Sequence, residues 1–219
     1  MDVSDSQDYF SLVTRRRAVE SSMFEYQLEL YDLSTLDQLK SVGIYSSYSE
    51  QKHPCKIVAG DRLIVVAARN HIIFYGFDLE EKFKILHEQQ NVYDLTASHD
   101  GAMVAMVGDN KILLWDTLSF RSLSFPFELM LARSCRFSYD NKYIGVSTTT
   151  TLSLYEIIPF GGSYTFEKRF GLDENVGFGT ISSFEFNQKK STKIVVGFSN
   201  ISPRIFDFEN PDSGLQVLF

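Results

Sequence analysis

Histidine side chains are the first groups of this chain to consider as metal ligands or proton-transfer groups. The four histidines are His53, His71, His87 and His99. They fall at unrelated positions, the pattern His-x-x-x-His does not occur, and no His-Glu pair suggests a metal site. His99 lies in a predicted turn, where we interpret it as a solvated residue. The histidines therefore predict no metal centre.

The two cysteines could act as nucleophiles or form a disulfide. Cys55 and Cys135 are 80 residues apart (135 − 55), and neither has a metal-ligand spacing around it. Each lies within an apolar stretch that is typical of a strand, so we expect two reduced core cysteines; a disulfide or a reactive thiol is the alternative. Unpaired cysteines are typical of intracellular proteins, so we expect a cytoplasmic or nuclear location.

Sequence motifs for covalent or phosphate chemistry are absent. The chain has no Gly-x-Ser-x-Gly nucleophile elbow and no Gly-rich phosphate loop followed by Lys-Ser/Thr. The carboxylates Asp78, Glu80 and Glu81 cluster at a predicted turn, where solvated side chains are expected. The sequence therefore predicts a protein that is not an enzyme and that binds no cofactor or metal.

Two basic clusters are the candidate partner-binding residues. Arg15, Arg16 and Arg17 are consecutive and stand out from a chain whose average charge is acidic. Lys168 and Arg169 fall near the end of a predicted outer strand. Either cluster could be a solvated edge or could dock an acidic partner.

The totals limit the function classes. Of the 219 residues, 44% are hydrophobic and 22% are charged, which is the balance of an ordinary globular protein. The net charge of −7 argues against broad nucleic-acid binding, because such binding requires lysines and arginines to neutralise phosphates. The first residues lack the apolar core of a signal peptide, and no stretch of eighteen apolar residues predicts a membrane span.

A repeated unit must position any functional residues, because apolar runs that end in an acidic residue recur along the chain. The acidic positions are 32, 78, 116, 156 and 207, so the separations are 46, 38, 40 and 51 residues. These separations bracket the ~40–45 residues of a propeller blade. The runs are Leu28-Glu29-Leu30-Tyr31-Asp32, Ile73-Phe74-Tyr75-Gly76-Phe77-Asp78, Ile112-Leu113-Leu114-Trp115-Asp116, Leu152-Ser153-Leu154-Tyr155-Glu156 and Arg204-Ile205-Phe206-Asp207.

Tight turns occur in phase with these runs. Ser98-His99-Asp100-Gly101 and Ser138-Tyr139-Asp140-Asn141 each precede a run by the same interval, and Gly and Asn suit tight hairpins because they tolerate positive φ. Gly60-Asp61 and Asn187-Gln188 take the equivalent place in two other units. Near-continuous apolar stretches such as 102–107 predict strands that are buried on both faces.

Together these features resemble the WD-repeat family. The resemblance implies an all-β fold, a partial or small β-propeller of four to five four-stranded blades. The Gly-His pair that typically opens such repeats is absent, so the usual hydrogen-bonded tetrad is incomplete. Because the family commonly has seven blades, three explanations remain: the chain is a fragment, a partner supplies the missing blades, or five blades close a compact ring.

The predicted boundaries follow from the repeats. Residues 1–7 are expected to be flexible, the first unit lacks an obvious first strand, and the segment from Pro159 to Gly179, with five glycines, is the best loop candidate. Leu215–Phe219 alternates like an outer strand but is also similar to a viral protease recognition sequence left by cloning. The predicted blades span residues 8–45, 53–88, 91–127, 131–170 and 180–219.

Two functions follow as expectations. The first is a non-catalytic protein–protein interaction scaffold, a subunit of a larger intracellular complex, because a rigid propeller offers many docking surfaces. The second is a phosphoinositide-reading propeller at a membrane, since Lys168-Arg169-Phe170-Gly171 is similar to the Phe-Arg-Arg-Gly motif of the PROPPIN family. The resemblance implies two consecutive arginines at the lipid, but Phe170 stands at the second position.

Overall fold

The computed structural model describes all-β architecture, as the sequence predicts. It contains five four-stranded antiparallel sheets, and no helix occurs in the part of the chain it describes. No helix long and apolar enough to cross a membrane is found in that part either. The described residues are 2–3, 8–17, 23–47, 54–58, 63–68, 70–89, 91–109, 111–125, 131–172, 179–210 and 216–217.

Each sheet is a meander in which consecutive strands pair with one another. Sheet 1 contains β1 (Asp2–Val3), β2 (Tyr9–Arg17), β3 (Phe24–Asp32) and β4 (Gln38–Ser47). Sheet 2 contains β5 (Cys55–Val58), β6 (Leu63–Ala68), β7 (His71–Gly76) and β8 (Glu81–Leu86). Sheet 3 contains β9 (Val92–Ala97), β10 (Met103–Gly108), β11 (Ile112–Asp116) and β12 (Ser122–Leu123).

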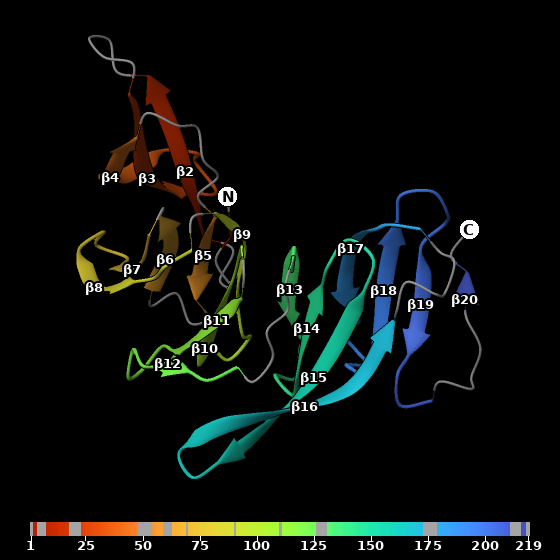
Figure 1. Ribbon diagram of the computed structural model, residues 1–219. Helices are drawn as coiled ribbons and strands as arrows, with labels where there is room; N and C mark the ends of the chain where they lie inside the picture. The colour runs from red at the N-terminus through yellow and green to blue at the C-terminus, as the bar shows by residue number, and fades with distance from the viewer. Residues whose placement is uncertain are drawn as a thin grey trace.

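The last two sheets have the same order. Sheet 4 contains β13 (Ser134–Phe137), β14 (Tyr143–Ser147), β15 (Leu152–Phe160) and β16 (Ser163–Leu172). Sheet 5 contains β17 (Ile181–Phe186), β18 (Lys193–Phe198), β19 (Arg204–Asp207) and β20 (Gln216–Val217). Figure 1 shows the sheets following one another around an arc, with sheets 1 and 5 at its two ends.

Four hydrophobic cores join the five sheets in series, one core between each consecutive pair. The strand β10 shows why this arrangement holds. Because side chains alternate along a strand, Met103 and Ala105 face sheet 4 while Val104 and Met106 face sheet 2. All six residues of β10 are buried, so the near-continuous apolar pattern predicted a strand with two covered faces correctly.

The end sheets differ from the middle ones, because each packs on one neighbour only. In β18, Ile194 and Val196 are fully buried, while Lys193 before them and Val195 between them are only half-buried. The described residues form no hydrophobic core between sheets 1 and 5. Within the described part of the chain, the row of sheets is therefore open, and the outer face of each end sheet has no sheet against it.

Serine and aspartate side chains fix the turns between the first two strands of sheets 3 and 4. Ser98 Oγ donates to Asp100 Oδ1 at 2.6 Å and accepts from the Met103 amide at 2.9 Å, and Gly101 has φ of 70°. The turn from Ser138 to Tyr143 repeats these two hydrogen bonds. These are the two Ser-x-Asp turns that the sequence predicts, whereas the predicted turn at Gly60-Asp61 lies outside the described residues.

Two expectations require correction. The first unit, expected to lack an obvious first strand, has one, because residues 2–3 pair with Ser11 and Phe10 as β1; two residues are too few to show a period in the sequence. Residues 1 and 4–7 of the N-terminus that was expected to be flexible lie outside the described residues. The segment from Pro159 is a long hairpin rather than a loop, because β15 and β16 pair to a two-residue turn at Gly161 and Gly162. Of the five glycines that suggested a loop, Gly161 and Gly162 form this tight turn, and Gly171 lies within β16. Residues 173–178, also in that segment, lie outside the described part.

Candidate functional site

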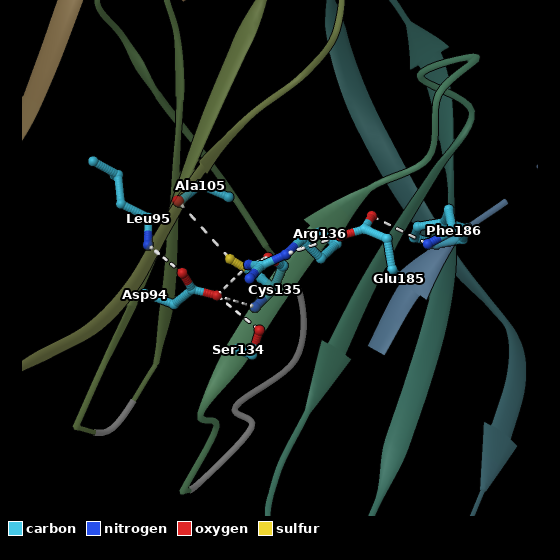
Figure 2. A network of polar contacts seen from close by, with 8 residues as sticks. All are labelled: Asp94, Leu95, Ala105, Ser134, Cys135, Arg136, Glu185 and Phe186. Atoms are coloured by element: carbon cyan, nitrogen blue, oxygen red, sulfur yellow. Dashed lines mark hydrogen bonds and ion pairs between the residues drawn. The ribbon is translucent and has the colours of Figure 1, made fainter. Parts of the chain in front are cut away.

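Charged side chains on the first strands of three consecutive sheets form a polar network (Figure 2). Arg136 on β13 lies between Asp94 on β9 and Glu185 on β17. Its Nη1 atom is 2.5 Å from Asp94 Oδ2, and its Nε atom is 3.5 Å from Glu185 Oε2. The first strands of neighbouring sheets contact one another, so this network crosses the inner side of the arc.

Asp94 is the anchor of this network. Its Oδ2 atom also accepts hydrogen bonds from Ser134 Oγ at 2.8 Å and from the Cys135 amide at 3.1 Å, and its Oδ1 accepts from the Leu95 amide at 3.0 Å. Burial disfavours the charged form of Arg136, but the adjacent Asp94 carboxylate outweighs this effect and raises the Arg136 pKa. A carboxylate held by this many donors suits a structural clamp better than a general base.

Cys135 lies within the same network, and its thiol is chemically quiet. The side chain is fully buried, and its Sγ lies 3.9 Å from the Ala105 carbonyl oxygen. Burial, and then the charge of Asp94, raise the pKa of this thiol well above its usual value. Cys55 is also buried and lies 3.6 Å from Ser11 Oγ. Both cysteines are free, in line with the expectation of reduced core cysteines.

The histidines are dispersed, and His87 is a core residue. His87 Nδ1 accepts from the Gln89 amide, so Nε2 carries the proton and donates to the Ala68 carbonyl oxygen at 3.2 Å. Burial lowers the pKa of His87, and it also lowers that of His71. His99 is exposed in its turn, and His53 lies outside the described residues. No group of metal-ligating side chains occurs within the described ranges.

The two basic clusters lie on separate sheets. Arg15 is exposed on β2 of sheet 1, with its guanidinium 4.9 Å from the Phe24 ring centre. Arg16 and Arg17 continue β2 and pair with Glu25 and Phe24 in the strand register.

Lys168 and Arg169 lie on β16 of sheet 4 and are exposed. Arg169 Nε donates to Glu156 Oε2 at 2.6 Å, and its Nη2 lies 3.1 Å from Glu167 Oε2. Hydrogen bonding to Glu156 raises the pKa of Arg169. The charge of Arg169 is therefore balanced by two carboxylates of its own sheet.

Exposed leucines in strained turns are a feature that the sequence analysis missed. Leu36, between β3 and β4, has φ of 61° and is 66% exposed. Leu131, between β12 and β13, has φ of 63° and is 63% exposed. Neither position favours leucine, because positive φ suits Gly or Asn and exposure suits a polar residue. No turn is predicted from the sequence at either position, so the sequence gave no signal for these two leucines.

An apolar pocket opens between sheets 2 and 3. Its volume is about 210 Å³, and the exposed side chain of Leu118 lies at its rim. The lining residues are Val58, Leu63, Gly101, Thr117 and Leu118.

Comparison with known proteins gives a fold and no family. No protein-family model matches the chain, and no curated protein matches it. Among solved structures, the chain is similar to a functionally unknown protein from Desulfotomaculum acetoxidans DSM 771, with a TM-score of 0.67 and 14% identity. The match covers 99% of this chain and 74% of that chain. A likeness at this identity shows a shared fold alone.

Proposed function

We propose that the chain is a non-catalytic protein–protein interaction scaffold, a subunit of a larger intracellular complex. We also propose that its five sheets are WD-repeat-type blades of a β-propeller that a partner completes. The serial face-to-face packing of four-stranded meanders supports the blades. The repeated Ser-x-Asp turns at Ser98 and Ser138 support the WD-repeat type.

The observation that carries the scaffold proposal is the pair Leu36 and Leu131. Each combines a backbone conformation that costs roughly 1–2 kcal/mol for an L-residue with an apolar side chain held in solvent. Backbone strain at an exposed position is typical of residues retained for binding. A partner that covers these leucines would remove their apolar side chains from water, which would offset the free-energy cost of their exposure.

The open row of sheets supports a partner that completes the fold. The outer face of sheet 5 carries half-buried Val195 and Ile205, which pair with each other in register, together with the Lys193–Asp207 ion pair. Such a mixed apolar and charged face resembles an interface more than a solvated surface. A further blade from a partner would cover it.

The test compares the wild-type full chain with the double variant Leu36→Asn, Leu131→Asn. Asparagine tolerates positive φ, so the variant should be more stable by about 1 kcal/mol or more per site. It should nevertheless recover fewer crosslinked partners from a lysate of the source organism, measured by quantitative mass spectrometry. Leu86→Asn is the matched control, because Leu86 is 68% exposed but lies in a regular strand. Unchanged recovery by the stabilised double variant would overturn the proposal.

The lipid-binding alternative gains no support from the geometry at β16. A headgroup phosphate would have to compete with Glu156 and Glu167 for Arg169. Phe170 cannot supply the second guanidinium that the resemblance implies. Flotation of the chain with anionic phosphoinositide vesicles, lost on Lys168→Glu with Arg169→Glu, would revive this alternative.

A further inference from the structure

The pocket between sheets 2 and 3 has a volume that suits one side chain. Its volume of about 210 Å³ is many times the ~10–15 Å³ that one water requires. It is smaller than the roughly 300–1,000 Å³ of pockets that enclose whole small molecules. Val58 and Leu63 provide an apolar wall from sheet 2, and Leu118 provides a rim that is 74% exposed.

The wall of the pocket on sheet 3 is preorganised by hydrogen bonds between two turns. The Thr117 hydroxyl donates to the Gly101 carbonyl oxygen, and the Thr117 amide donates to the Ala102 carbonyl oxygen at 2.9 Å. The Asp116 carboxylate also accepts from the Leu118 amide. A fixed wall lowers the entropic cost of binding, because the pocket residues do not have to be ordered by the ligand.

Two carboxylates directly precede lining residues of the pocket in the sequence. Asp100 precedes Gly101 and Asp116 precedes Thr117, and the hydrogen bonds of both to their own turns end on Oδ1. None of these turn hydrogen bonds uses an Oδ2 atom. Burial and then the charges of Asp116 and Asp100 raise the pKa of Tyr164 on β16, so both carboxylates act on this one residue, which packs against the core between sheets 3 and 4.

From this arrangement we propose that the pocket binds an aliphatic side chain of a partner peptide in which basic residues flank that side chain. The inference rests on the proposed scaffold function and specifies the chemistry of one partner. The apolar wall selects Leu, Ile or Val, and the two carboxylates select Lys or Arg next to it. Leu118 closes over the bound side chain and loses its exposure to solvent.

The test uses a fluorescein-labelled peptide, Lys-Arg-Leu-Leu-Arg-Lys, and the full-length chain. Fluorescence anisotropy should show binding that weakens at high salt. The peptides Glu-Asp-Leu-Leu-Asp-Glu and Lys-Arg-Ser-Ser-Arg-Lys should not bind, because each lacks one of the two features. Leu118→Lys should weaken binding about tenfold or more, given what burial of a leucine contributes.

Leu86→Lys is the matched control, because Leu86 is 68% exposed, close to the 74% of Leu118, and lies on β8 outside the lining of the pocket. It should bind like the wild type, and circular dichroism should show both variants folded. Double replacement of Asp100→Asn and Asp116→Asn should weaken binding of the basic peptide while it preserves both turns, since Asn keeps the Oδ1 acceptor.

Three results would overturn the inference: no binding of the basic peptide, equal binding of the acidic peptide, or equal loss in the two lysine variants. A concentration-dependent dimer that Leu118→Lys abolishes would assign the pocket to a second copy of the chain instead. The scaffold proposal fails separately, through the Leu36 and Leu131 variant. If the basic peptide does not bind but the Leu36 and Leu131 variant still recovers fewer partners, only the pocket proposal is rejected.

Discussion

Replacement of Asp94 tests whether the polar network clamps sheets 3 and 4 together. Asp94→Asn keeps the size of the side chain but removes the charge that holds Arg136, Ser134 and the Cys135 amide. The Asp94 side chain is 18% exposed and that of Arg136 is 34% exposed, so solvent screens the pair only in part. Hydrogen bonds to charged groups contribute about 1.5–3 kcal/mol.

We expect Asp94→Asn to lower the free energy of unfolding by about 2–3 kcal/mol, below the ~3–5 kcal/mol typical of fully buried pairs. Glu185→Gln is the internal comparison, because Glu185 is 65% exposed and its contact with Arg136 is 3.5 Å. Exposed pairs contribute about 0–1 kcal/mol. The ratio of the two effects therefore measures how much of the network is shielded from water.

Urea unfolding is the assay, and the single tryptophan makes it local. Trp115 is 2% exposed in the core between sheets 2 and 3, so its fluorescence reports on sheet 3. With a slope of about 2 kcal/mol/M, Asp94→Asn should lower the midpoint by about 1 M. Coincident fluorescence and circular dichroism curves would justify the two-state treatment. Equal losses in Asp94→Asn and Glu185→Gln would refute the reasoning.

Three further measurements probe the cores. Because burial lowers the pKa of His87 below 6.5, the folded state binds fewer protons, so stability should fall as the pH drops through 6.5, and His87→Gln should reduce that fall in a pH series of urea curves. Gly145→Ala places a Cβ 2.5 Å from Phe184 and should lower the free energy of thermal unfolding by about 1–3 kcal/mol. By contrast, the Cβ of Gly43→Ala meets no atom within 4 Å, so this variant should stabilise β4 by about 0.5 kcal/mol. A reversed order of the two stabilities would contradict the packing of sheets 4 and 5. Ellman's reagent should label neither Cys55 nor Cys135 until the chain unfolds, and rapid labelling of the native chain would disprove their burial.

Sequence reasoning identified the all-β class because the local signals agree with the tertiary structure. Strand β10 is apolar on both faces since a sheet packs on each side of it, and the turn at Asp100 is encoded within four residues. β18 matched this pattern less well, because sheet 5 packs on one neighbour only.

The candidate site could not be predicted in the same way, because its contacts join distant parts of the chain. Asp94 and Arg136 are 42 residues apart, and no periodicity links them. The pairing of Arg169 with Glu156 depends on the long hairpin β15–β16, and the glycines of this segment led the sequence analysis to predict a loop there. The positive φ of Leu36 and Leu131 could not be predicted from residue type, because leucine disfavours this backbone conformation.

The serial order of the four cores determines which sheets should unfold locally most often. Sheets 2, 3 and 4 each lose two interfaces when they open, but sheets 1 and 5 lose only one. The chain therefore behaves like a short linear polymer that frays from both ends. Amide protons of β10 and β14 should exchange with deuterium most slowly, and those of sheets 1 and 5 should exchange first, until a neighbour docks on the exposed ends and slows them.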